Sequence, residues 1–303
     1  MGQTRLAALG EPIPVPRDGG PEVRKAVADK ARSVIRLARA AFPGWSPPPF
    51  GPETFAAALG IPVIQSNRPV PWDAALVPFA DGPRIICNGL VRSAARRRFS
   101  VAHEIAHCFF ADADERARMR TANRDAYDES PESRRLERMC DLGAAELLMP
   151  QPWFGEAVSE AGFTAESVTA LAGRFGVSLE AAGLRMMEHS PRPCAVGFFH
   201  YAAEPTAGQA GKGRPGAGGT VTYRVKRAFR SPGFPFLFPT GKSIPSGSVI
   251  YRASLRQGGL ESRETFSLGE ASHEVHVSAF PLHDGPVVTE PPTVVAVLSL
   301  VTQ

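Results

Sequence analysis

Two histidines and a glutamate interrupt an apolar stretch of the sequence, FSVAHEIAHCFF, at residues 99–110. The stretch has no glycine or proline, and its apolar positions are typical of a largely buried helix. His103 and His107 stand four positions apart, so a helix would present both imidazoles to a single metal ion. The H-E-x-x-H spacing therefore indicates a metal centre. The alternative is two ordinary, partly exposed histidines beside a surface glutamate. The apolar setting disfavours this alternative, because it predicts that the three side chains are buried, and burial without partners costs several kcal/mol.

A catalytic zinc ion needs a third protein ligand, since such sites use three and keep the fourth position for water. A second helical pattern runs from Arg134 to Met149, where Pro150 ends it. Glu137 and Asp141 lie four positions apart on its apolar stripe, and two carboxylates that face a core favour a bound cation. We predict that Glu137 is the third ligand and that Asp141 accepts the second N–H of a ligand histidine. Salt bridges to neighbouring arginines are the alternative.

Glu104 follows a ligand but is rotated about 100° from it around the helix, so we predict that it faces the open position of the ion. There it would act as a general base, taking a proton from a metal-acidified water and returning it to the leaving amine of a cleaved peptide. Zn2+ suits two imidazoles and a carboxylate best, although Mn2+ or Fe2+ also fit such donors. Tyr127 and His200 are candidate oxyanion donors, and each would otherwise be a packing residue.

The elements that position these residues belong to an α+β chain of 303 residues, which has room for about two domains. We expect residues 1–20 to be a flexible N-terminus and residues 21–160 to form the peptidase domain. Helical periodicity, closed by a proline and a glycine, predicts a helix at 21–42. A short helix and three short strands are expected next, at 53–60, 61–65, 74–79 and 84–89. The polar run at 111–133 predicts an exposed excursion.

Two short helices are predicted within residues 161–190, with Gly176 at the turn, as in a helix-turn-helix segment. This segment makes a DNA-binding transcriptional regulator, with a structural or sensory metal site, the alternative function. The second helix carries Glu180 and Glu188 against a single Arg185. That charge pattern matches phosphate poorly, so a packing extension of the peptidase is the favoured interpretation.

The last third of the sequence is rich in predicted strands and is expected to form a separate domain, residues 191–303. A run rich in glycine and proline at 203–219 predicts a flexible loop within it. Strand patterns stand on both sides of this loop, at 194–202, 220–229, 247–254, 274–280 and 293–301.

Composition limits the classes of function. The net charge of +4 permits a nucleic-acid partner without indicating one. The arginines at 92, 96, 97 and 98 are better explained as a solvated helix start than as a docking site for an acidic partner. No run approaches the ~18 apolar residues of a membrane helix. The first twenty residues lack a signal-peptide core, so we expect a cytoplasmic protein. The four cysteines are far apart and suit reduced core thiols.

Two blocks of the sequence, RRRFSVAHEIAH at 96–107 and ERMCDLGAAELLMP at 137–150, resemble the ImmA/IrrE family of metallopeptidases. An upstream strand and the stretch LAGRFGVSLEAAGLRM at 171–186 extend the resemblance. It implies that the motif histidines and the glutamate heading the second block bind the metal. In this sequence these residues are His103, His107 and Glu137.

The layout is similar to that of deinococcal radiation-response members of the family. This implies a small zincin-like peptidase core, a helix-turn-helix-like segment and a sheet-rich, GAF-like C-terminal domain, which as a class often binds small molecules. The activity implied is site-specific endopeptidase cleavage of an XRE-family (DdrO-like) transcriptional repressor, which derepresses stress or DNA-damage response genes. The sequence departs from many relatives at Cys140 and Asp141, where Ala-Asn is frequent, and at Gly143, where an aromatic residue is common.

Overall fold

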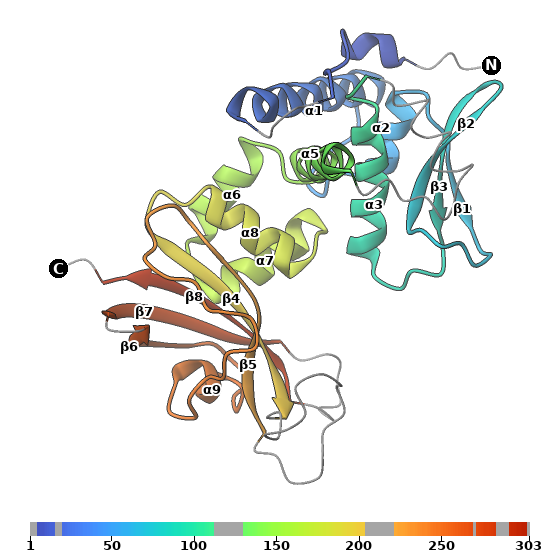
Figure 1. Ribbon diagram of the computed structural model, residues 1–303. Helices are drawn as coiled ribbons and strands as arrows, with labels where there is room; N and C mark the ends of the chain where they lie inside the picture. Colours follow the sequence, from blue (N-terminus) through green and yellow to red (C-terminus); the bar gives the residue numbers. More distant parts are fainter. Residues whose placement is uncertain are drawn as a thin grey trace. The chain divides into compact units, whose positions relative to one another are not determined.

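The computed structural model describes residues 5–15, 20–111, 130–203, 221–268, 271–282 and 291–301. These residues form helices and two separate sheets, which confirms the predicted α+β class (Figure 1). The chain divides into two compact units. The first comprises residues 1–154 and 173–178, and the second comprises 155–172 and 179–303.

The first unit contains four α-helices among its described residues and a small sheet. The helices are α1 (Pro21–Ala41), α2 (Pro52–Ala58), α3 (Ala94–His107) and α5 (Pro131–Leu148), preceded by a 3-10 helix at Leu6–Leu9. The strands are β1 (Val63–Ser66), β2 (Ala74–Phe79) and β3 (Gly82–Asn88). Their order is β1-β3-β2, with β1 parallel and β2 antiparallel to β3, so β2 is an edge strand.

Helix α3 lies between this sheet and α5, as Figure 1 shows. It begins earlier than the apolar run suggests, because the Ser93 hydroxyl accepts the Arg96 N–H at 3.2 Å and so caps the helix. The two helices approach closely where Gly143 of α5 meets α3. A Cβ added at Gly143 would lie 2.6 Å from the Cβ of Ala106, so only glycine fits at this separation. This close approach brings the polar side chains of α5 within reach of the histidines on α3.

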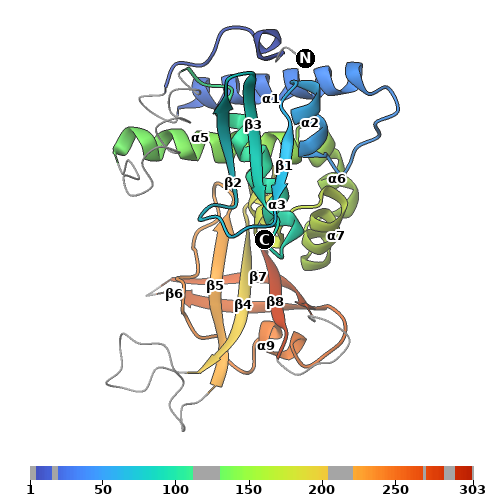
Figure 2. The same cartoon turned by 90° about the vertical axis from the view of Figure 1, so that its right-hand side faces the viewer.

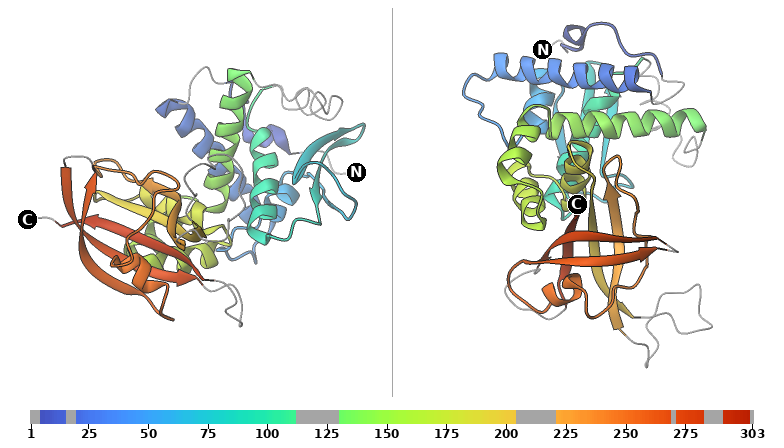
Figure 3. Two further views of the ribbon diagram at one scale, coloured as in Figure 1. Left: turned by 60° about the horizontal axis from the view of Figure 1, so that its bottom comes forward. Right: turned by 90° about the vertical axis from the view of Figure 1, so that its left-hand side faces the viewer.

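The second unit is built around a five-stranded antiparallel sheet, which Figures 2 and 3 show from three further directions. Helices α6 (Trp153–Ala161), α7 (Ala165–Phe175) and α8 (Leu179–Glu188) precede it. The strands are β4 (Cys194–Ala203), β5 (Val221–Arg230), β6 (Leu260–Leu268), β7 (Ala271–Leu282) and β8 (Thr293–Leu300), with α9 (Val249–Ala253) between β5 and β6. The strand order is β5-β4-β8-β7-β6, and every neighbouring pair is antiparallel.

The two faces of the five-stranded sheet have different covers. Helix α8 packs on one face, where a Cβ at Gly183 would lie 3.2 Å from Val196 and 3.0 Å from Phe198. Helix α9 and the preceding loop cover the other face. Three alternate phenylalanines of that loop, Phe234, Phe236 and Phe238, are buried in the core there.

One predicted strand is wrong. Residues 247–254 contain the helix α9, because the Ser248 hydroxyl accepts the Ile250 N–H at 3.3 Å and caps the helix. The carboxylate of Glu264 accepts the Val249 N–H as well. The strand that pairs with β7 at this edge is instead β6, whose alternation of exposed and half-buried residues carries a weak apolar signal. Helix α6 was also missing from the expected elements.

Candidate metal centre

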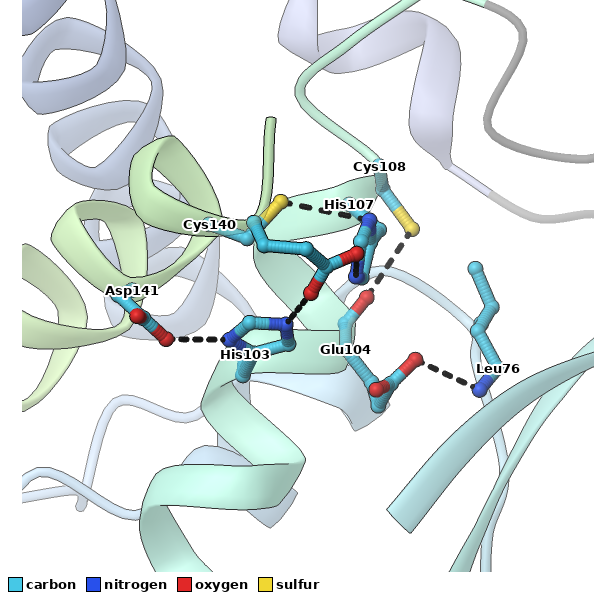
Figure 4. A network of polar contacts seen from close by, with 8 residues as sticks. Leu76, His103, Glu104, His107, Cys108, Cys140 and Asp141 are labelled. Atoms are coloured by element: carbon cyan, nitrogen blue, oxygen red, sulfur yellow. Dashed lines mark hydrogen bonds and ion pairs between the residues drawn. The ribbon is translucent and has the colours of Figure 1, made fainter. Parts of the chain in front are cut away.

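The two motif histidines of α3, which are labelled in Figure 4, contact Glu137 of α5 in the first unit. The Nε2 atom of His103 lies 3.0 Å from Oε2 of Glu137, and the Nε2 atom of His107 lies 3.8 Å from Oε1 of the same carboxylate. The imidazole centroids are 4.9 Å apart. The structure therefore brings the three predicted ligands together, with both Nε2 atoms facing one carboxylate.

The other ring nitrogens are held by the next turn of α5. The Nδ1 atom of His103 lies 2.9 Å from Oδ1 of Asp141, and the Nδ1 atom of His107 lies 3.3 Å from Sγ of Cys140. Asp141 thus lies within hydrogen-bond distance of the second ring nitrogen of His103, and its role there stays a prediction. The cysteine partner of His107 was missed, although its position beside Asp141 and three residues after Glu137 places it on the same side of the helix.

Glu104 faces the sheet and is held by an edge strand. Its Oε2 accepts the backbone N–H of Leu76, in β2, at 2.8 Å. The side chain is buried, with 6% of the residue exposed. The carboxylate therefore has a fixed direction in a water-poor setting, which suits a proton-transfer group. Sequence reasoning could not find Leu76, because the donor is a backbone group and its identity carries no signal.

The carboxylates control the charge of His103. Burial alone would lower its pKa, but hydrogen bonds to Asp141 and Glu137, and the nearby charge of Glu104, raise the pKa of His103 to about 9. Without a metal, this imidazole is therefore protonated at neutral pH. The surplus of carboxylates that keeps the proton on the ring would equally stabilise a divalent cation.

The donor set fits a metal ion of the zinc type. Two imidazole nitrogens and a carboxylate within a few ångströms are a common catalytic set. A second combination, the side chains of His103, His107 and Cys140, also has its donor atoms within 4.8 Å of one another. We favour the set with Glu137, because both Nε2 atoms face that carboxylate, whereas Cys140 contacts the other nitrogen of His107.

The structure does not test the two candidate oxyanion donors. Tyr127 lies outside the described residues. His200 lies on β4, in the second compact unit, where it pairs across the sheet with Arg224. Neither assignment gains support from the geometry of the first unit, and both stay predictions.

The segment predicted to resemble a helix-turn-helix has little free basic surface on its second helix. Arg185 is 4% exposed and forms an ion pair with Glu188 at 3.1 Å. Glu180 pairs with Lys226 of β5 at 3.1 Å, and α8 packs on the sheet. These contacts support the packing interpretation.

The basic cluster at the start of α3 is also engaged. Arg96 pairs with Asp73, and Arg97 donates to the carbonyls of Val91 and Arg92. Arg98 donates to the carbonyls of Phe50 and Gly176 at 2.6 and 3.0 Å. Their hydrogen bonds tie the helix start to its surroundings, which supports neither nucleic-acid docking nor a purely solvated face.

Comparisons with known proteins assign this centre to a class. Residues 56–187 match the family described as Peptidase_M78, IrrE N-terminal-like domain. The match includes all residues of the cluster and supports a metallopeptidase.

Two curated relatives carry the name radiation response metalloprotease IrrE. The relative from Deinococcus radiodurans is 27% identical over 237 residues, covering 78% of this chain and 68% of the relative. The relative from Deinococcus deserti is 29% identical over 161 residues, and this chain spans about half of its length, 53%. Together, the family match at residues 56–187 and these two relatives support a metallopeptidase of the ImmA/IrrE type.

A solved structure titled Mycobacterium tuberculosis transcriptional regulator is also similar. It has a TM-score of 0.48 and 17% sequence identity, over 92% of this chain and 80% of that one. Among the described residues, none of the helices has both the length and the apolar character needed to cross a membrane.

Proposed function

We propose that this chain is a zinc-dependent endopeptidase that makes a limited cut in an XRE-family, DdrO-like transcriptional repressor. The cut would derepress stress or DNA-damage response genes in the cytoplasm. The observation that carries the proposal is the convergence of both histidine Nε2 atoms on Glu137, with the buried Glu104 carboxylate on the same helix as the two histidines. The relatives' name links a metalloprotease to the radiation response, which supports a stress-related substrate.

Each residue of the cluster has a separate task in this proposal. His103, His107 and Glu137 would hold the ion, which when bound supplies the Lewis acidity that acidifies water and polarises the peptide carbonyl. Glu104 takes the proton of the attacking water and gives it to the leaving amine. The Leu76 N–H on Oε2 keeps the Glu104 carboxylate in one orientation during both transfers.

Zinc is the proposed ion because two imidazoles and a carboxylate are a frequent catalytic zinc set. Mn2+ and Fe2+ accept the same donors and are the competing assignments. Metal analysis of protein purified without added metal would distinguish the three.

The proposed organisation is a peptidase domain at 21–160, a helix-turn-helix-like segment at 161–190 and a GAF-like domain at 191–303. The antiparallel sheet, with α8 on one face and α9 on the other, supports a GAF-like architecture. The burial of Arg185 in α8 supports a packing role for the middle segment.

A cleavage assay tests the activity. The metal-loaded protein is incubated with XRE-class repressors from its own genome, and the fragments are measured by mass spectrometry. We expect one discrete cut, reduced at least ~10²-fold in Glu104→Gln, which removes the general base but keeps the metal ligands. Glu132→Gln, at the exposed start of α5, is the matched control and should cleave normally.

The outcomes separate the two functions under consideration. If the wild type and Glu104→Gln both bind metal and neither cuts any repressor, the peptidase proposal fails. A specific mobility shift with operator DNA at physiological salt would then favour the DNA-binding regulator.

A further inference from the structure

We infer that Cys140 is a positioning residue of the metal centre. Its sulfur accepts the Nδ1–H of His107 and so directs the Nε2 of that ring towards the ion. The inference rests on the metal centre of the proposed function. It gives a task to a thiol that is neither a ligand of the favoured set nor a proton-transfer group.

The contact is short and fully enclosed. The Cys140 sulfur lies 3.3 Å from Nδ1 of His107, within hydrogen-bond distance for sulfur. Cys140 is 0% exposed and His107 is 3% exposed. Water has little access to either atom, so the ring nitrogen must be satisfied by the protein.

The protonation of the ring sets the direction of this hydrogen bond. A neutral imidazole carries its hydrogen on one nitrogen, so a ring that offers Nε2 to an ion carries the hydrogen on Nδ1. Metal-bound histidines usually donate this second N–H to a partner, which fixes the tautomer and the ring orientation. For His107, the sulfur of Cys140 is in the right place to be that partner.

The same turn of α5 gives the two histidines chemically different partners. Asp141 gives His103 a charged partner that is exposed, with 56% of its side chain accessible, whereas Cys140 gives His107 a neutral partner in the core. A carboxylate in place of this thiol would add a buried negative charge beside Glu104 and Glu137. A thiol accepts the hydrogen bond without that electrostatic cost.

Direct ligation of the ion by Cys140 is the competing assignment, since its sulfur belongs to a possible donor group with both histidines. The geometry points the other way. The sulfur contacts Nδ1, while Nε2 of the same ring faces Glu137, and the two nitrogens of one imidazole point in different directions.

Two substitutions and a matched control test the inference. Zinc affinity is measured by competition with a chromogenic chelator. We expect Cys140→Ala to weaken zinc binding about 10- to 100-fold, as loss of a histidine's hydrogen-bond partner typically does. Cys140→Ser keeps an acceptor and should stay within about threefold of the wild type. Cys87→Ala removes another buried thiol of the first unit and should leave affinity unchanged.

Cobalt spectroscopy of the wild type separates positioning from ligation, and it needs no variant to fold. Co2+ bound through sulfur gives an intense near-ultraviolet charge-transfer band. We expect that band to be absent and the spectrum to match nitrogen and oxygen ligation. A strong sulfur-to-cobalt band would overturn the inference, and so would an alanine variant that binds zinc as tightly as the wild type and the Cys87 control.

These readouts are independent of the substrate. If no repressor is cut but Cys140→Ala still loses zinc affinity, the proposed function fails and the positioning role stands. If a repressor is cut and the alanine variant binds zinc normally, the proposed function stands and the positioning role fails.

Discussion

Zinc affinity at this centre should rise steeply with pH, because the ion must displace a proton from His103. Burial opposes that proton, but the hydrogen bonds to Asp141 and Glu137 outweigh it and raise the pKa of His103 to about 9. An imidazolium cannot bind a metal. At pH 7, two pH units below that value, affinity should be about 100-fold weaker than above pH 9, changing about tenfold per pH unit.

The assay is a chelator competition from pH 6.5 to 9.5, carried out on three proteins. Asp141→Asn removes a charged acceptor that raises the pKa of His103, so its affinity should level off at a lower pH than that of the wild type. Asp29→Asn, on the exposed face of α1, is the matched control and should follow the wild type. The pH at which zinc affinity stops rising is diagnostic, because Asp141→Asn can also lower the affinity at every pH. A wild-type affinity that stays constant between pH 7 and 9 would refute the reasoning.

The raised pKa of His103 has the opposite effect on the stability of the metal-free protein, which falls as the pH rises. A histidine whose folded pKa exceeds its unfolded value stabilises the folded state below the unfolded pKa of about 6.5. That contribution is lost as the pH rises towards 9. Zinc should therefore protect the protein most at alkaline pH, where the apo form has lost this contribution.

Three further predictions concern stability. Gly143→Ala should lower the midpoint of thermal unfolding, because the added Cβ would lie 2.6 Å from the Cβ of Ala106. Such overpacking costs about 1–3 kcal/mol. An unchanged midpoint would show that α3 and α5 separate freely. Burial, then the charge of Arg185, lowers the pKa of His189 to about 4, so its contribution to stability should be lost as the pH falls from about 6.5 towards 4. Urea unfolding of His189→Gln across that range should show a shallower loss than the wild type. Ser248→Ala removes the cap of α9 and should cost about 1 kcal/mol in chemical unfolding, with Ser262→Ala on β6 as a near-neutral control.

The sequence predicts those parts of the site that depend on helical periodicity. His103, His107, Glu137 and Asp141 lie on two regular helices, so their phases show which side chains share a face. The Leu76 donor to Glu104 lies 28 residues away in a strand, and its distance depends on how α3 packs against the sheet. The pattern of residues in the sequence does not predict that distance.

The fold shows the same limit. Helix α1 follows its predicted range closely, because a long amphipathic period with a terminating proline is a strong signal. The five residues of α9 are apolar and β-branched enough to resemble a strand. Ser248 and Glu264 decide in favour of a helix by satisfying its first N–H groups, and Glu264 comes from a strand that follows later in the chain.

Residues 173–178 make the two units inseparable by any single cut of the chain. This segment belongs to the first unit, where Phe175 stacks on Phe50 at 6.3 Å and Gly176 accepts a hydrogen bond from Arg98. The residues on either side of it belong to the second unit. A protein engineer who wished to exchange C-terminal units between relatives would therefore find no clean splice site near the end of the family match at residue 187. A chimera joined there would keep Phe175 and Gly176 with the first unit, but it would separate α8 from β4 and β5, on which it packs.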